Sequence, residues 1–234
     1  MNKPKKIFII RHGQSEANVD KSIYVTKPDF AVNLTPLGTQ QAVSAGIELK
    51  NTVPENEKFS VYYSPFFRGI QTLNNISISL GKDRFNREFI REDPRIREQE
   101  WYGNFAEKGY NDEKSDVLEE ECNSYGKFFY RFAGGESSAD VYDRVSDFIN
   151  TIHRDFEKEN YPENTIIVTH GMTMRVILMK WFHKTVQEFE TWVNPKNCQI
   201  LTLTLNEETK KYDFDFEIIK KTNPLHPHVC KLEI

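Results

Sequence analysis

Two histidine–glycine pairs stand far apart in this sequence, and each directly follows a short apolar run. The first, His12-Gly13, follows residues 6–10 and is preceded by Arg11. The second, His170-Gly171, follows residues 165–169. Apolar, β-branched runs of this length are typical of buried strands in a parallel sheet. Each strand would therefore carry an imidazole to its carboxyl end, which is where open α/β sheets bind their ligands.

A third strand end supplies another guanidinium. Ser64-Pro65 closes the run at residues 59–63, and Arg68 falls in the first turn of the helix expected after it. If the three strands are neighbours in one sheet, Arg68 joins Arg11 and both histidines at a shared edge. Guanidinium groups bind the oxygens of a phosphoryl dianion bidentately, and helix N-termini offer further N–H donors. One imidazole is then left to act as a nucleophile, so the sequence indicates phosphoryl chemistry.

Strand and helix signals alternate along the chain, a pattern that is typical of α/β folds. We expect a three-layer α/β/α sandwich, with a mostly parallel central sheet and helices on both faces. In chain order the predicted elements are strand 6–11, helix 36–49, strand 59–64, helix 66–80, strand 84–91, helix 138–156, strand 165–169, helix 171–182 and a closing antiparallel pair of strands at 201–205 and 212–218.

Residues 99–135 are the least regular stretch, with charged side chains at 112–121 and an aromatic cluster at 128–132. We interpret this stretch as an insertion, partly helical, that lies over the strand ends as a lid. The aromatic cluster fits the protein core and a substrate pocket equally well. Because no linker separates the remaining elements, we expect one domain over residues 1–234.

The composition narrows the class of partner. A formal net charge of −4 over 234 residues argues against a nucleic-acid-binding protein. No apolar run in the chain approaches the roughly 20 residues that span a bilayer. The apolar run at residues 7–10 is too short for the hydrophobic region of a signal peptide. Three cysteines without a close pair fit a reducing compartment. We therefore expect a cytoplasmic protein with a small phosphorylated substrate; its oligomeric state stays open.

Four short motifs follow one another along the chain and together lie within residues 7–182. They are RHGQSEAN at 11–18, SPFFR at 64–68, RIRE at 95–98 and VTHG at 168–171. In this order they resemble the histidine phosphatase superfamily, in its phosphoglycerate-mutase-like branch. The segments at 92–99 and 179–182 are similar to the group of fungal broad-range acid phosphatases and plant phosphoglycerate-mutase-like proteins.

The resemblance implies catalytic roles for five residues. His12 would attack phosphorus and become phosphohistidine, and Glu98 would protonate the leaving alkoxide and later activate water. Glu100 competes with Glu98 for this role, because an acid in a charged run is easily misaligned by two positions. The equatorial phosphoryl oxygens would be held by Arg11, Arg68 and His170.

The same resemblance implies the remaining contacts and the absence of a metal. The candidates for substrate binding are Asn18, Arg97, Arg131 and Gly171. No metal or cofactor is expected, because the arginines and His170 supply the positive charge. Gln99 follows Glu98 where phosphoglycerate mutases carry Arg, and no Arg-Arg pair occurs between residues 98 and 135. This favours hydrolysis over the alternatives, a bisphosphoglycerate-dependent mutase or a non-catalytic module that binds a phosphorylated ligand.

Overall fold

The computed structural model of this protein describes residues 3–101 and 121–220. The described residues contain a six-stranded sheet with the strand order β3-β2-β4-β1-β5-β6. Strands β1 to β4 run parallel to their neighbours in this group, whereas β5 is antiparallel to both β1 and β6. The strands are β1 (Lys6–Arg11), β2 (Phe59–Tyr63), β3 (Phe85–Glu92), β4 (Asn164–Thr169), β5 (Ile200–Leu205) and β6 (Tyr212–Asp213).

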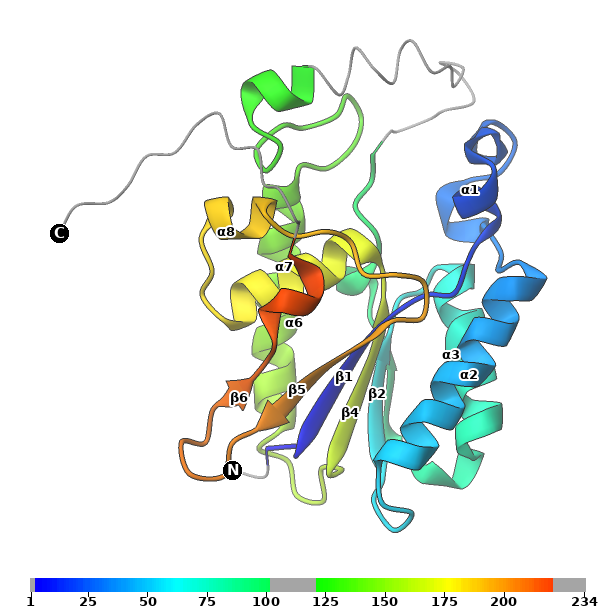
Figure 1. Ribbon diagram of the computed structural model, residues 1–234, viewed down its shortest axis with the longest axis vertical. Coiled ribbons are helices and arrows are strands. Elements are labelled where there is room, and N and C mark those ends of the chain that lie inside the picture. The colour runs from blue at the N-terminus through cyan, green and yellow to red at the C-terminus, as the bar shows by residue number, and fades with distance from the viewer. Residues whose placement is uncertain (1–2, 102–120, 221–234) are drawn as a thin grey trace, which may run out of the picture.

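Helices cover both faces of this sheet (Figure 1). Along β1, Ile7 and Ile9 pack on the side of α6 and α7, whereas Phe8 and Ile10 pack on the side of α2 and α3. This alternation follows from the two-residue period of a strand. The mostly parallel sheet and its two helical layers confirm the predicted sandwich. The longer helices are α2 (Pro36–Thr52), α3 (Phe67–Leu80), α6 (Ser138–Asp155) and α7 (Gly171–Trp181).

Short helical elements lie in the connections between the longer ones. Several of them follow strand ends and therefore reach the edge of the sheet at which ligands are expected. They are α1 (Glu16–Val19), α8 (Val186–Glu190) and the 3-10 turns η1 (Lys21–Val25), η2 (Asp29–Ala31), η3 (Lys82–Arg84), η4 (Pro94–Ile96) and η5 (Phe216–Ile219).

The helix signals in the sequence are confirmed where a cap or an apolar stripe defines them. Helix α2 has Pro36 in its first turn, and the Thr35 hydroxyl accepts the N–H of Gly38 at 3.0 Å. Helix α3 ends at Gly81, whose φ of 107° favours glycine. The apolar stripe predicted for α6 is fully buried, as the values for its members show: Val141 0%, Val145 0%, Phe148 0%, Ile152 0% and Phe156 2% exposed.

The strand predicted over residues 212–218 is wrong in its length. Of residues 212–218, only the two of β6 pair with β5. The chain then turns into η5, where the Asp215 carboxylate accepts the N–H of Glu217 at 3.0 Å. The aromatic ring of Phe216 stacks on Trp192 with centroids 5.1 Å apart. The alternating apolar residues of this segment therefore reflect the packing of Phe216 on Trp192, just after α8, and not a longer strand.

The predicted insertion lies only partly within the described residues, because residues 102–120 fall outside them. At the described end of this insertion, the members of the aromatic cluster differ in burial. Phe128 and Phe132 are buried, and Phe128 packs against Phe189 at 5.4 Å, whereas Phe129 is 57% exposed. Phe128 and Phe132 thus belong to the core; the prediction of a lid stays untested. Within the described ranges no helix is long and apolar enough to cross a membrane.

Candidate active site

The carboxyl ends of three adjacent strands bring the predicted residues together. His12 follows β1, His170 follows β4, and Arg68 lies in the first turn of α3, which follows β2. Because β4 lies between β1 and β2, these three side chains share one edge of the sheet. The two imidazole centroids are 5.1 Å apart, and His12, Arg68 and His170 are all at most 3% exposed.

His12 is held as a neutral imidazole with a free lone pair. Its Nδ1 lies 2.7 Å from the carbonyl oxygen of Gly13. A carbonyl oxygen only accepts hydrogen bonds, so Nδ1 carries the proton and Nε2 carries the lone pair. Burial, and then the charges of Arg68 and Arg11, hold the pKa of His12 well below its usual range. Both observations favour a neutral ring whose Nε2 lone pair is available for attack.

Two close glycine contacts fix the turn that carries His12. The N–H of Gly13 donates to the Thr72 hydroxyl at 3.0 Å. A Cβ on Gly13 would lie 2.4 Å from the carbonyl oxygen of Gly38, and a Cβ on Gly38 would lie 2.0 Å from that of Gln14. Only glycines allow this approach between the turn and the start of α2.

His170 presents a buried ring nitrogen to the same space. Its Nε2 lies 2.7 Å from the hydroxyl of Ser64, which also accepts the N–H of Phe66 at 3.3 Å. A hydroxyl can donate one hydrogen bond and accept two, so either tautomer of His170 satisfies the bond between Nε2 and Ser64. Nδ1 is buried and has no hydrogen-bond partner among the described residues. Burial, and then Arg68, lower the pKa of His170 well below its usual value.

Two guanidinium groups complete the cationic part of the site. Nη1 of Arg68 lies 2.7 Å from the carbonyl oxygen of Asp29 and 2.8 Å from its carboxylate Oδ1. Nη1 of Arg11 donates to the carbonyl oxygen of Pro195 at 2.7 Å, whereas its buried Nε has no partner in the part of the chain that the structure describes. Burial lowers the pKa of Arg11. The fixed orientation of both groups suits them to an oxyanion.

Glu98 lies on the segment after η4, and its Oε1 accepts the N–H of Gln99 at 3.0 Å. Burial raises the pKa of Glu98, while the charges of Arg68 and Arg11 oppose that shift. The Glu98 carboxyl group thus feels the charge of both guanidiniums. The competing residue, Glu100, is exposed. Of the two acids, Glu98 is therefore the one that interacts with the cationic part of the site.

Asn18 and Gly171 lie at the same edge of the sheet. The Asn18 side-chain oxygen accepts the N–H of Ser15 and an N–H of the Asn197 side chain, both at 3.1 Å. The exposed Asn18 thus secures the turn after His12. Gly171 begins α7, where a Cβ would lie 3.0 Å from the side chain of Asn194.

The two other arginines proposed for substrate binding are paired with acids of the α6 region. Nη2 of Arg97 lies 2.5 Å from Oε1 of Glu136. Arg131 forms an ion pair with Asp140 in the first turn of α6, and its side chain is 62% exposed. The structure does not show either guanidinium turned toward His12, so their contact with substrate stays a prediction.

Several residues near the site carried no signal in the sequence. Asp29 forms an ion pair with Arg68. Tyr24 interacts with both of these residues, and burial, followed by the charge of Asp29, raises the pKa of Tyr24. The Asn197 amide donates to the carbonyl oxygen of His12 at 3.1 Å. The one indication in the sequence concerned Tyr24 and Asp29: both lie in the long polar connection between β1 and α2, and loops at strand ends often carry function.

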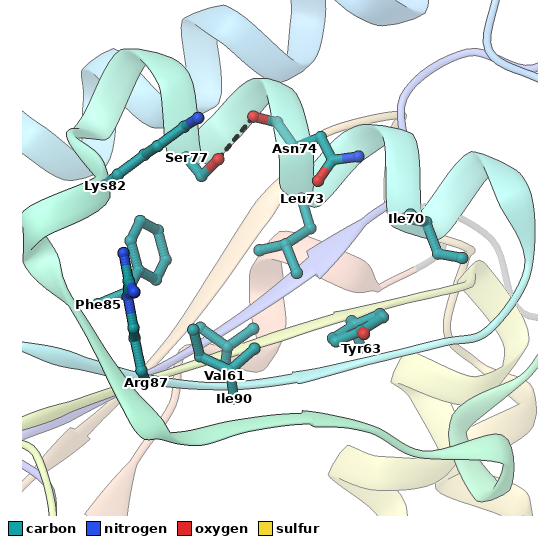
Figure 2. A pocket seen from close by; sticks show the side chains of 10 residues that line it. All are labelled: Val61, Tyr63, Ile70, Leu73, Asn74, Ser77, Lys82, Phe85, Arg87 and Ile90. Atoms are coloured by element: carbon teal, nitrogen blue, oxygen red, sulfur yellow. Dashed lines mark hydrogen bonds between the residues drawn. The ribbon is translucent and has the colours of Figure 1, made fainter.

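A separate groove of about 280 Å³ lies between α3 and the edge strand β3 (Figure 2). Its walls are mostly apolar, with Leu73 on the helix and Val61 and Ile90 on the strands, and Lys82 and Arg87 lie at one end. None of the residues predicted for the site lines it. The groove is therefore distinct from the cluster around the two histidines.

The chemistry of the cluster follows from its unpaired nitrogen atoms. Arg11 Nε is a buried N–H group without an acceptor in the described part of the chain, and the buried Nδ1 of His170 has no hydrogen-bond partner there either. Such groups are rare in native proteins and call for an explanation, such as a bound anion. Within the described residues no group of three or more His, Cys, Asp or Glu side chains could hold a metal ion. The arrangement can hold an oxyanion and present a neutral imidazole to it.

Comparisons with known proteins agree with this arrangement. The model of the histidine phosphatase superfamily (branch 1) matches residues 7–214. The phosphoglycerate mutase-like protein AT74 of Arabidopsis thaliana is 40% identical over 215 residues, which cover 87% of this chain but only 66% of that protein, just under two thirds. The broad-range acid phosphatase DET1 of Saccharomyces cerevisiae is 29% identical over 299 aligned residues, covering 90% of this chain and 88% of that protein.

Solved structures share the fold. The native structure of a mycobacterial glucosyl-3-phosphoglycerate phosphatase superposes with a TM-score of 0.68 at 18% identity, covering 92% of this chain and 98% of that one. The region that the family model matches contains both histidines and all of the sheet except Lys6, the first residue of β1. The chain thus belongs to the histidine phosphatase superfamily.

Proposed function

We propose that this protein is a metal-independent phosphatase that hydrolyses small phosphomonoesters through a phosphohistidine on His12. The observation that carries the proposal is that two buried nitrogen atoms without partners, Arg11 Nε and His170 Nδ1, belong to residues next to the neutral imidazole of His12, from which the His170 ring is 5.1 Å away. The names of the relatives, an acid phosphatase and a phosphoglycerate mutase-like protein, support an enzyme that transfers phosphoryl groups.

In the first step, Nε2 of His12 attacks phosphorus in line with the ester oxygen. A nitrogen–phosphorus bond forms, the phosphorus–oxygen bond breaks, and the leaving oxygen takes the proton of the Glu98 carboxyl group. The equatorial oxygens bind Arg11, Arg68 and His170, where the charge of the transition state is stabilised.

In the second step, water attacks the phosphoryl group of phosphohistidine. The Glu98 carboxylate accepts a proton from that water, and the nitrogen–phosphorus bond breaks with its electron pair returning to Nε2. Inorganic phosphate leaves, and both residues regain the protonation state in which they began. No step needs a metal ion, because the guanidiniums stabilise the anionic oxygens.

The test is a panel of phosphomonoesters assayed for phosphate release with and without EDTA. We expect release from several esters at the same rate in both conditions. The same samples are assayed for interconversion of 2- and 3-phosphoglycerate in the presence of bisphosphoglycerate. Interconversion that is faster than phosphate release would identify a mutase instead, and loss of hydrolysis in EDTA would contradict the metal-independent mechanism.

The pKa shifts predict activity with a maximum in acidic solution. The lowered pKa of His12 keeps the nucleophile neutral below pH 6.5, so activity falls only as the pH drops through that lowered value. The raised pKa of Glu98 keeps the acid protonated above pH 4.5, so activity falls again as the pH rises through it. Measurement of kcat/KM for an alkyl phosphate between about pH 3 and pH 9 reports both limbs.

The variant Glu98→Gln serves as the control for this profile. It retains the shape of the side chain but has no proton to lose, so the alkaline limb assigned to Glu98 should disappear along with most of the activity. The ester itself has a second pKa of about 6, which must be allowed for in the profile. An unchanged alkaline limb in the variant would show that another group is the acid.

A further inference from the structure

We propose that Arg144 and Glu136 are positioning residues that hold the Glu98 carboxyl group over the leaving oxygen. This inference rests on the proposed role of Glu98 as the general acid. Neither residue belongs to the cluster that holds the phosphoryl group. They act on the segment that carries Glu98, residues 95–100, which begins within η4 and continues as irregular backbone from Arg97.

Arg144 reaches this segment from α6 and binds three of its carbonyl oxygens. Nη1 donates to the carbonyl oxygens of Arg95 at 2.6 Å and Arg97 at 3.0 Å, and Nη2 donates to that of Glu98 at 3.1 Å. Backbone carbonyls outside regular structure need such partners when they are shielded from water. One guanidinium therefore replaces the hydrogen bonds that a strand or helix would have supplied.

Glu136 fixes the guanidinium from the other side. Its carboxylate accepts Nε and Nη2 of Arg144, both at 2.9 Å, and also Nη2 of Arg97 at 2.5 Å and the N–H of Glu100 at 3.2 Å. Burial acts against the carboxylate form, but the hydrogen bond and charge of Arg144 outweigh it and lower the pKa of Glu136. The bidentate pair leaves Arg144 one orientation, since a planar fork binds a carboxylate in a fixed geometry.

The same segment is tied to the elements that carry His170. The Thr169 hydroxyl donates to the carbonyl oxygen of Ile96 at 2.6 Å, and the Thr173 hydroxyl donates to that of Arg97 at 2.7 Å. Among the residues that the structure describes, the Glu98 carboxylate receives only the N–H of Gln99. Its position relative to the phosphoryl site is therefore set through its backbone, and Arg144 supplies the one side-chain donor to the Glu98 carbonyl in the described part of the chain.

The experiment compares two esters that differ in their need for an acid. A nitrophenyl phosphate releases a stable phenolate without a proton, whereas an alkyl phosphate requires one. We expect Arg144→Met to lower kcat/KM for the alkyl ester by about 100-fold and for the nitrophenyl ester by less than about 5-fold. Glu136→Gln should show the same selectivity with a smaller loss, because it loosens the guanidinium without removing it.

Two further variants separate the geometry of the guanidinium from a general loss of stability. Arg144→Lys keeps the charge but not the planar fork, so we expect a selective loss of about 10-fold for the alkyl ester. Arg91→Met removes a different ion pair of α6, between Arg91 and Asp155 at 3.0 Å, and should leave the ratio of the two esters unchanged. The melting temperature of each variant is measured alongside.

The reference is Glu98→Gln, which must itself be selective for the alkyl ester. If it is selective and both Arg144 variants instead lose equal activity on the two esters, or lose none, the positioning role is wrong. If Glu98→Gln lowers both esters equally, the proposed acid is wrong. A loss of activity that is selective for the alkyl ester in Arg144→Met, Arg144→Lys and Glu136→Gln supports the inference.

Discussion

Replacing His12 with alanine is expected to lower kcat/KM for every phosphomonoester substrate by about 10⁴-fold or more, since removal of a catalytic nucleophile typically costs that much. In the proposed mechanism this imidazole is the neutral nucleophile, and among the described residues its ring makes a hydrogen bond only through Nδ1, to the carbonyl oxygen of Gly13. The neighbouring His170 cannot replace it, because its Nε2 is bound to the Ser64 hydroxyl at 2.7 Å. The measurement is the initial rate of phosphate release from an aryl and an alkyl ester.

The matched control is His153→Ala, which removes an imidazole on the exposed surface of α6. It should retain essentially full activity. Circular dichroism and thermal melting of His12→Ala establish that the fold persists, because His12 is buried and its ring contacts that of His170. A folded His12→Ala protein with more than about a tenth of the normal activity would show that another residue attacks phosphorus.

Replacing Arg68 with methionine is expected to lower kcat/KM by about 10³-fold, which is the scale of a guanidinium that stabilises a transferring phosphoryl group. The variant should also bind inorganic phosphate much more weakly as a competitive inhibitor. Two effects combine, because the loss of Arg68 removes a cation and leaves the Asp29 carboxylate, at 2.8 Å in the native protein, without the guanidinium that balances its charge. That carboxylate would then repel the substrate.

The two effects can be separated with Asp29→Asn. Added to Arg68→Met, it removes the unpaired negative charge and should recover a part of the lost activity, of about 10-fold. Arg68→Lys should be intermediate, because an ammonium keeps the charge but binds as a single point. If Arg68→Met left the inhibition constant of phosphate unchanged, the guanidinium would not be a phosphate ligand and the proposed site would be wrong.

The positions of His12, His170 and Arg68 could be predicted because each depends on one local feature. A buried strand followed by His-Gly or Ser-Pro fixes where a side chain leaves the sheet, and parallel strands place all such ends on one edge. The caps of α2 and the buried stripe of α6 are equally local, and both are confirmed. The order of these strands in the sheet was not predicted, but the structure places β2, β4 and β1 side by side, as the predicted cluster requires.

The remaining features depend on contacts between segments that are distant in sequence. Asp29 meets Arg68 across 39 positions, and Arg144 meets the carbonyl oxygen of Arg95 across 49. No periodicity records such contacts. The environments of Arg97 and Arg131 were unpredictable for a related reason: whether an arginine faces a ligand or an acidic neighbour depends on the side chains that approach it in three dimensions.

The most direct test of the mechanism uses an ester labelled in its phosphoryl group. During turnover the reaction is stopped rapidly with a non-acidic denaturant, and the label bound to the protein is measured. We expect a burst of labelled protein that approaches one phosphoryl group per chain, stable in alkali and labile in acid, as nitrogen–phosphorus bonds are. Mass spectrometry should locate the label on the peptide that contains His12, and His12→Ala should carry none. A label on any other residue, or turnover without a labelled protein at any quenching time, would contradict the phosphohistidine mechanism.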